Sequence, residues 1–379
     1  MTDKVKRFIE CIVPVSACNL KCHYCYIIQN NCRYNEIPKF KYSAEHIAKA
    51  LSKKRMGGVC LINICGAGET LLCRELIDIS RKLVEEGHYV NITTNGTITE
   101  RFKEFSTFPK EILEKINFSF SLHYIELKEK NLLSTYFNNI RMMKESGASI
   151  LVQFNMCDEY IPYLDEIKNI CIENVGAMPQ IALTRDEMSK EIKIFSKLSK
   201  EEYFALGSGF DSPLFDFTNR NFKQKQTKFC YAGEWSFRLD LTTGDAKRCY
   251  FEDYTQNWFE DINLPIKLNP VGMNCRLQYC INSSHFMALG NIPQIKCETY
   301  SELRDRVCKD NTHWQTEKMR NFLSTKLYNS NKRYLNERKN TFWENIFSFR
   351  KVAGEGYKAL QHKVLTIFWI KLKFKTNNK

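Results

Sequence analysis

The sequence has 379 residues, of which 43% are hydrophobic and 13% aromatic, and a formal net charge of +13. Such a chain can bury the cores of about two domains, and its composition excludes a disordered protein. Its sixteen cysteines, with no visible cleavable signal sequence, indicate metal binding or buried thiols in a reducing cytoplasm, as in an anaerobic cell. Residues 350–379 contribute +7 of the charge, and no nucleic-acid-binding motif is visible, so we expect no nucleic acid partner.

Short apolar runs alternate with amphipathic stretches from residue 7 to about residue 185. Six such strand–helix repeats predict a parallel sheet with right-handed crossovers, closed in part into a (β/α)6 TIM-like barrel of the α/β class. The strands are expected at 7–15, 59–64, 89–94, 116–121, 150–155 and 180–184. The helices between them are expected at 44–53, 71–86, 100–115, 125–146 and 161–173. In a barrel of this kind, the chemistry gathers where the strands end.

Three cysteines follow the first expected strand in a Cys-x3-Cys-x2-Cys pattern: Cys18, Cys22 and Cys25, with Tyr24 before the last. Three thiolates can hold three corners of a [4Fe–4S] cluster and leave the fourth iron open for chemistry. A zinc site needs four ligands, usually in Cys-x2-Cys pairs, and a disulfide needs an oxidising compartment. The pattern resembles the signature of the radical S-adenosylmethionine (SAM) superfamily.

The second expected strand runs into Gly66, Gly68 and Glu69. Glycines at a strand end let backbone groups approach a ligand closely, and a glutamate can accept a hydrogen bond from an ammonium group. This segment is similar to the Gly-Gly-Glu segment that binds the amino group of SAM in the superfamily, with Ala67 as a departure from the usual pattern.

Polar residues at the ends of the later strands complete the expected SAM and substrate site. The Thr-Asn-Gly turn after the third strand resembles a superfamily motif, with a plain strand-end turn as the alternative. On the fourth strand, Ser121 matches a superfamily serine that helps hold SAM, whereas His123 replaces the usual aspartate, so its role stays open. Alternation places the polar residues of the fourth and fifth strands on one face of each strand. The expected cofactor-binding residues in these segments are Asn95, Ser119, Ser121, Gln153, Asn155 and Arg185.

A second cysteine set begins at Cys230, and a Thr-Thr-Gly-Asp turn between apolar runs predicts a β-hairpin that brings Cys230 close to Cys249. This segment resembles the auxiliary-cluster domains of radical SAM enzymes, called SPASM or twitch domains. Cys275 and Cys280 would complete four ligands for one auxiliary [4Fe–4S] cluster, with zinc as the alternative metal and Cys297 as a further candidate ligand.

The predicted domains are a radical SAM barrel at 1–190, a linker with helical connection at 191–228, a small cysteine-rich α+β auxiliary domain at 229–325 and a basic helical tail at 326–379. The tail combines apolar residues with many lysines and is too short and charged to span a bilayer. It either rests on an anionic membrane at the inner face or packs on the protein.

The resemblance implies that a cluster on the first three cysteines binds SAM and passes it one electron, supplied by a reductant such as flavodoxin or ferredoxin. The resulting 5′-deoxyadenosyl radical would abstract hydrogen from a substrate carbon, an oxidoreductase or maturase chemistry. We expect a carbohydrate or glycoconjugate substrate, because 285–293 and 299–304 are similar to the C-terminal block of radical SAM/SPASM proteins found beside glycosyltransferases. The alternatives are RiPP-type peptide or protein maturation and a non-catalytic metal-binding protein.

Overall fold

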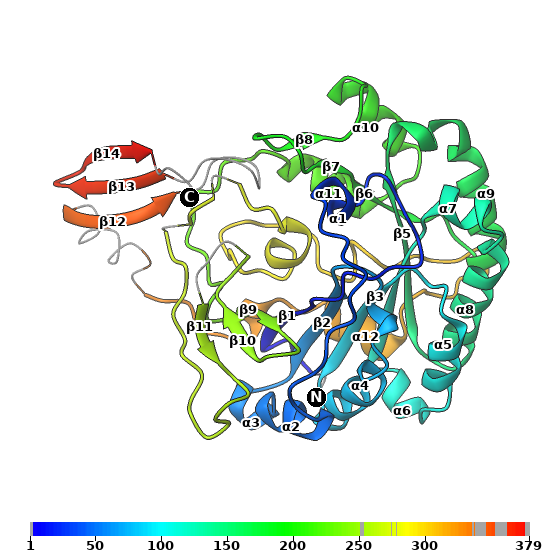
Figure 1. The fold of residues 1–379 in the computed structure, drawn as a ribbon, viewed down its shortest axis with the longest axis horizontal. Helices are drawn as coiled ribbons and strands as arrows, with labels where there is room; N and C mark the ends of the chain where they lie inside the picture. The colour runs from blue at the N-terminus through cyan, green and yellow to red at the C-terminus, as the bar shows by residue number, and fades with distance from the viewer. Residues whose placement is uncertain are drawn as a thin grey trace.

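The computed structural model describes residues 3–250, 254–273, 275–277, 279–335, 337, 346–352 and 362–375. It is a mixed α/β fold with a parallel central sheet whose outer face is covered by helices (Figure 1). The predicted fold class, a partial barrel followed by a smaller cysteine-bearing part, is therefore confirmed.

The first six strands form parallel neighbours in chain order, and their predicted bounds differ from the observed ones by at most two residues. A row of polar side chains crosses this sheet, because Glu10, Asn63, Asn91 and Asn117 are successive register partners and each asparagine donates to its neighbour. The strands are β1 (Arg7–Val13), β2 (Cys60–Gly66), β3 (Tyr89–Thr94), β4 (Ile116–Ser121), β5 (Ser149–Met156) and β6 (Gln180–Leu183).

The crossover helices form where predicted, but several are shorter or divided. The expected helix at 100–115 is broken before Pro109, which cannot continue a helix, and the one at 125–146 is broken at Asn131, which adopts a left-handed conformation. The helices are α1 (Tyr26–Gln29), α2 (Ala44–Ala50), α3 (Lys53–Met56), α4 (Leu76–Glu85), α5 (Thr99–Ser106), α6 (Lys110–Leu113), α7 (Tyr124–Glu129), α8 (Leu133–Glu145), α9 (Leu164–Val175), α10 (Lys200–Ser208), α11 (Pro213–Asn221) and α12 (Glu317–Leu323), with shorter turns η1 (Thr70–Leu72), η2 (Asp158–Tyr163), η3 (Ser283–Met287) and η4 (Leu327–Asn329).

Strand β9 (Ser236–Asp240) pairs in parallel with β1 and carries β10 (Asp245–Lys247) and β11 (Tyr254–Asn257) on its other side. The hairpin predicted over the Thr-Thr-Gly-Asp turn is present, with Gly244 in the left-handed conformation. The second cysteine region is thus joined to the barrel through one continuous sheet. The short pair β7 (Arg185–Asp186) and β8 (Lys193–Ile194) follows β6.

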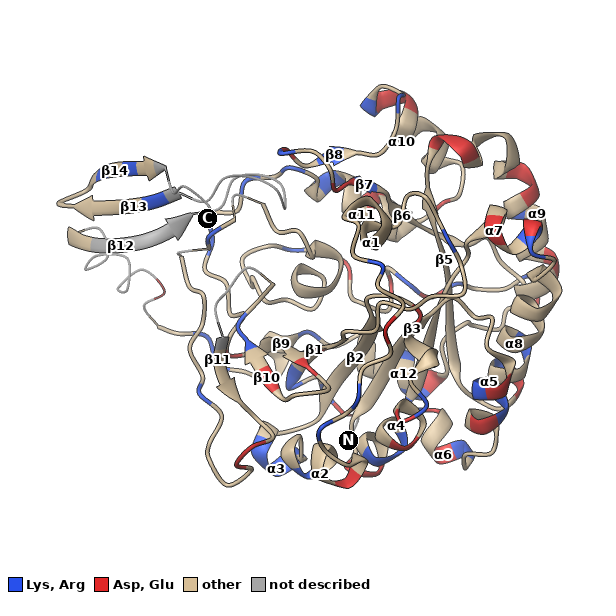
Figure 2. Cartoon of the chain, in the orientation of Figure 1, with Lys and Arg blue, Asp and Glu red and all other residues tan. Residues whose placement is uncertain are grey.

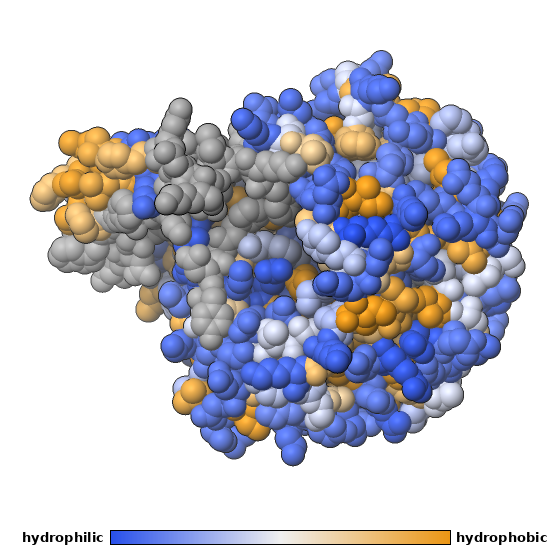
Figure 3. Space-filling view, viewed as in Figure 1, coloured by the Kyte–Doolittle hydropathy of each residue, from blue (hydrophilic) through white to orange (hydrophobic). Residues whose placement is uncertain are grey.

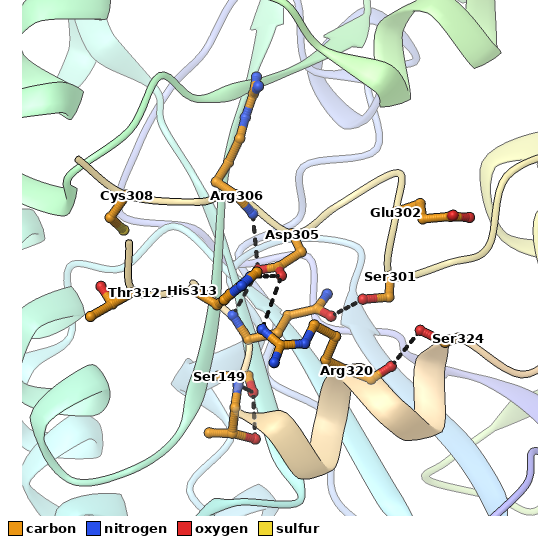
Figure 4. Close-up of polar contacts among 12 residues, drawn as sticks. Ser149, Ser301, Glu302, Asp305, Arg306, Cys308, Thr312, His313, Arg320 and Ser324 are labelled. Atoms are coloured by element: carbon orange, nitrogen blue, oxygen red, sulfur yellow. Dashed lines mark hydrogen bonds and ion pairs between the residues drawn. The ribbon is translucent and has the colours of Figure 1, made fainter. Parts of the chain in front are cut away.

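Residues 301–324 close the barrel at the amino ends of its strands. The Tyr89 ring at the start of β3 stacks on Phe322 of α12 at 3.8 Å between centroids, and the Thr316 backbone N–H donates to Ser149 Oγ at the start of β5. Asp305 holds this segment together by pairing with the ring of His313 and accepting from the backbone N–H of Gln315 (Figure 4). The carboxyl ends of the strands are left for the site.

The predicted basic helix in the tail is wrong for the described residues 347–352 and 362–375. These form a three-stranded antiparallel sheet of β12 (Phe347–Val352), β13 (His362–Ile367) and β14 (Ile370–Lys375), seen at the left in Figure 1. Alternating apolar and basic residues in β14 have the period of a strand rather than that of a helix. The rest of the predicted helix, at 338–345, 353–361 and 376–379, lies outside the described residues. Within the described segments, no helix has both the length and the apolar character needed to cross a membrane.

Candidate active site

A cavity of about 310 Å³ opens at the carboxyl ends of the barrel strands and is lined by all three cysteines of the Cys-x3-Cys-x2-Cys motif. Most of the predicted cofactor-binding residues lie on its wall: Tyr24, Gly66, Gly68, Glu69, Asn95, Ser121, Asn155 and Arg185. Two predicted residues are placed elsewhere. Ser119 donates to Asn91 Oδ1 at 3.0 Å, and Gln153 lines an adjoining cavity.

The glycine segment is bonded directly to the chain that leads into the cysteine loop. The backbone N–H groups of Gly68 and Glu69 donate to the carbonyl oxygens of Val15 and Ala17, at 2.5 and 2.9 Å, and so continue the β1–β2 pairing beyond the strands. A Cβ atom at position 68 would lie 2.1 Å from the Ala17 carbonyl oxygen. Only glycine fits this approach, which fixes the cysteine loop beside the end of β2.

Glu69 is buried, with 2% of its surface exposed, and its carboxylate is held by three donors. One oxygen accepts from Thr94 Oγ1 at 2.7 Å and from the Leu71 N–H at 2.9 Å, and the other accepts from the Asn95 N–H at 2.7 Å. Burial raises the pKa of Glu69 above its usual range, and these hydrogen bonds oppose that rise. Since a carboxylate offers about four acceptor positions, one remains for a ligand ammonium group.

The cysteine loop is fastened by residues that the motif does not contain. The Arg33 guanidinium donates to the carbonyl oxygens of Leu20, at 2.7 Å, and of Cys18. Asn95 Nδ2 donates to Asn19 Oδ1 at 2.7 Å and lies 3.8 Å from Cys18 Sγ. The Thr-Asn-Gly turn therefore contacts the cysteine loop. Neither Arg33 nor Asn19 was predicted as a site residue from the sequence.

The three thiols fit the donor set of an iron–sulfur cluster. Burial raises the pKa of Cys18 and of Cys22, so both resist ionisation without a cation beside them. A metal cluster supplies that positive charge, and the Leu20 N–H, 3.5 Å from Cys18 Sγ, is oriented to stabilise a bound thiolate. Cys18, Cys22 and Cys25 could therefore hold an iron–sulfur cluster.

Tyr24 is positioned by a neutral histidine. Its hydroxyl lies 2.7 Å from His123 Nδ1 and 3.0 Å from the Tyr160 hydroxyl. Burial lowers the pKa of His123 to about 4, so the ring is uncharged near neutral pH. His123, which follows β4, thus contacts the aromatic residue of the cysteine motif. Tyr160 was not identified from the sequence, because it comes from η2 in a different repeat.

Arg185 connects the first cavity to the segment that carries the second cysteine set. Its Nε lies 3.3 Å from a Glu187 carboxylate oxygen, and its Nη1 donates to the Ile281 carbonyl at 3.0 Å. Gln29 joins the same region to the cysteine loop, because it donates to the Tyr24 carbonyl at 2.7 Å and accepts from the Glu187 N–H at 2.9 Å. Both sides of the cavity are thereby held together.

The second cysteine set also converges. Cys230, Cys249, Cys275 and Cys280 line one mostly apolar cavity, and Cys230 is held by paired backbone hydrogen bonds with Gly272. Burial raises the pKa of Cys249, and the other three thiols add to that rise because they lie close to it. Cys297 does not line this cavity, and its sulfur lies 3.5 Å from Lys326 Nζ. Four converging thiols suit either an iron–sulfur cluster or zinc.

Fold and site together define a partial barrel with a three-cysteine centre at the ends of its strands. Residues 12–157 match the family model described as the radical SAM superfamily.

Solved structures with the same fold include Streptococcus suis SuiB bound to S-adenosylmethionine, at 17% sequence identity and a TM-score of 0.50. That match covers 70% of this chain, which spans about 66% of the length of SuiB. Native anSMEcpe with bound AdoMet aligns at 17% identity and a TM-score of 0.49, covering 67% of this chain and 79% of that one. At this identity, the likeness to SuiB concerns the fold alone. No curated protein matches the sequence.

Proposed function

We propose that the protein is a radical SAM enzyme that reductively cleaves SAM and abstracts hydrogen from a carbon of a carbohydrate or glycoconjugate. The observation that carries this proposal is the convergence of Cys18, Cys22, Cys25 and Glu69 on one cavity at the strand ends. When bound there, an iron–sulfur cluster would supply the electron that converts SAM into methionine and a 5′-deoxyadenosyl radical.

The chain's own residues would bind and orient the cofactor. The free acceptor position on Glu69 suits the amino group of SAM, and the backbone at Gly66 and Gly68 permits its close approach. Asn95, Ser121 and Asn155 offer hydrogen bonds to ribose or amino-acid groups along the same wall. Tyr24, fixed by neutral His123, would pack beside the cluster ligands.

A second cavity, of about 260 Å³, adjoins the first and shares Asn155, Leu183 and Arg185 with it. Its wall includes the amide side chains of Gln153, Asn155, Asn221 and Asn282, the hydroxyls of Thr218, Ser283 and Ser284, and the cations Arg185 and Lys223. No carboxylate is among its described lining residues.

This lining supports a polyhydroxylated substrate that carries negative charge, such as a sugar phosphate or a nucleotide-linked sugar. Amides both donate to and accept from sugar hydroxyls, and cations pair with phosphate or carboxylate. A peptide would also find amide partners, but the combination of hydroxyl, amide and cationic groups on the wall favours the anionic carbohydrate. An auxiliary cluster on the second cysteine set would lie beside this substrate, because Cys280 lines both cavities.

The test is anaerobic turnover of the reconstituted protein with dithionite as the reductant and candidate substrates deuterated on carbon. A sugar phosphate or nucleotide-linked sugar that stimulates 5′-deoxyadenosine formation and transfers deuterium into it would support the proposal. Lys223→Gln should raise the KM for that substrate, whereas Lys228→Gln, which removes an exposed lysine outside the cavity, should not. Deuterium transfer only from peptides would replace the carbohydrate with a peptide substrate.

A further inference from the structure

The small sheet formed by β12, β13 and β14 has one apolar face. Directly opposite residues in antiparallel strands share a face, and Phe347 pairs with Ile367, Ile367 with Ile370, and Leu365 with Leu372. Phe374 lies on the same face by alternation along β14. This face is exposed: 67% of Phe347, 65% of Ile370 and 49% of Phe374 are accessible to solvent. Figure 3 shows the apolar residues gathered at this end of the molecule.

The opposite face carries positive charge. Lys371 and Lys373 alternate with the apolar residues of β14. Their register partners on β13 are Thr366 and Val364, which are buried. Both lysines are exposed. The segment 347–375 contains seven Lys or Arg and one acid, Glu355, for a net charge of +6, and neither β13 nor β14 carries an acidic residue (Figure 2).

Two aromatic residues form the tip between β13 and β14. Phe368 and Trp369 adopt left-handed conformations, with φ of 45° and 65°, as a two-residue hairpin turn requires. Asparagine and glycine are the usual residues of such a turn, because a bulky side chain is disfavoured at positive φ. Here 66% of Phe368 and 58% of Trp369 are exposed, so the turn presents two large aromatic groups to the surroundings.

We propose that this sheet, defined by β12–β14 and its Phe368–Trp369 tip, docks the protein on an anionic lipid bilayer. The apolar face and the tip would enter the boundary between headgroups and acyl chains, where aromatic residues are favoured. The lysines would remain at the level of the lipid phosphates, each contributing electrostatic attraction. The charge favours an anionic bilayer over a second copy of this sheet, because two copies would each carry +6 and repel one another. This inference is independent of the substrate proposed above.

The experiment is co-sedimentation of the full chain with vesicles of phosphatidylcholine alone or mixed with phosphatidylglycerol. We expect binding to the anionic vesicles that weakens as salt is added. Trp369→Ser should weaken it about tenfold, from lost apolar burial, and Lys371→Gln with Lys373→Gln about thirtyfold. Tyr34→Ser, which removes an exposed aromatic residue elsewhere, is the matched control and should bind normally.

Circular dichroism and gel filtration of each variant establish that it is folded before binding is compared. Equal binding of Trp369→Ser and Tyr34→Ser to anionic vesicles would overturn the proposal, as would failure of the native chain to bind them. Concentration-dependent dimerisation that is lost in Trp369→Ser, without vesicle binding, would also overturn it and identify a second copy as the occupant.

Discussion

Replacing Glu69 by glutamine tests whether this residue binds the cofactor or only supports the loop. The substitution keeps the shape of the side chain but removes its charge. The amide oxygen can still accept from Thr94 and Leu71, and the amide NH2 then faces the backbone N–H of Asn95, which is itself a donor. The variant therefore loses the Asn95 hydrogen bond as well as the acceptor position that we assign to the ammonium group of SAM.

The expected losses separate the two roles. A hydrogen bond between charged groups contributes about 1.5–3 kcal/mol, so SAM affinity should fall about 10- to 150-fold. The unpaired Asn95 N–H should lower the free energy of unfolding by about 1–3 kcal/mol. Anaerobic calorimetric titration of the reconstituted protein with SAM measures the first quantity, and chemical denaturation measures the second.

Glu10→Gln is the matched control, because Glu10 is a buried carboxylate that does not line the cavity and also accepts a hydrogen bond, from Asn63. Its SAM affinity should equal that of the native protein. If Glu69→Gln is destabilised but binds SAM within twofold of the native protein, the assignment of Glu69 to the ammonium group is refuted.

Three further predictions concern the loop, the barrel interior and the second cysteine set. Gly68→Ala should sharply reduce the iron bound on reconstitution, measured by elemental analysis, because its Cβ would displace the Ala17 carbonyl. Burial raises the pKa of Glu10 to about 7 from 4.5, so the folded chain holds a proton that the unfolded chain releases, and stability falls as pH rises through this window. Glu10→Gln should remove that fall, about 2.5 kcal/mol between pH 5 and pH 8, in urea denaturation at the two pH values. An unchanged pH dependence would contradict this prediction. Cys249→Ala should remove about half of the bound iron and leave SAM cleavage in place, whereas full iron retention would exclude it as a ligand.

The local patterns of the sequence predicted much of the barrel and of the site. Strands β3 and β4 have the expected bounds, and the Asn95-Gly96 turn closes the apolar run of β3. Gly68 was identified because Gly-x-Gly-Glu, one strand after the cysteine loop, resembles a superfamily segment; alone, the same pattern is typical of a tight turn. The Ala17 carbonyl that Gly68 approaches lies on the chain that continues β1 beyond Val13, beside the end of β2.

The remaining contacts depend on distances that no local pattern encodes. Arg33 reaches back to Cys18 across a loop, and Tyr160 reaches Tyr24 from a different repeat. Neither Arg33 nor Tyr160 belongs to a sequence motif that would distinguish it from an ordinary surface or core residue. The helix prediction for the tail was wrong for another reason. The apolar residues there fit one face of a helix only loosely, whereas the strict alternation in β14 is the stronger pattern and is typical of a strand.

Anaerobic reconstitution followed by iron and sulfide analysis and a SAM cleavage assay tests the central claim most directly. We predict about eight iron atoms per chain, two [4Fe–4S] clusters, and formation of 5′-deoxyadenosine with dithionite. Loss of that product in Cys22→Ala would place the chemistry at the first cysteine site, and half the iron with cleavage intact would remove only the auxiliary cluster. Bound zinc in place of iron, with no cleavage of SAM, would contradict the enzyme assignment and leave a metal-stabilised binding protein.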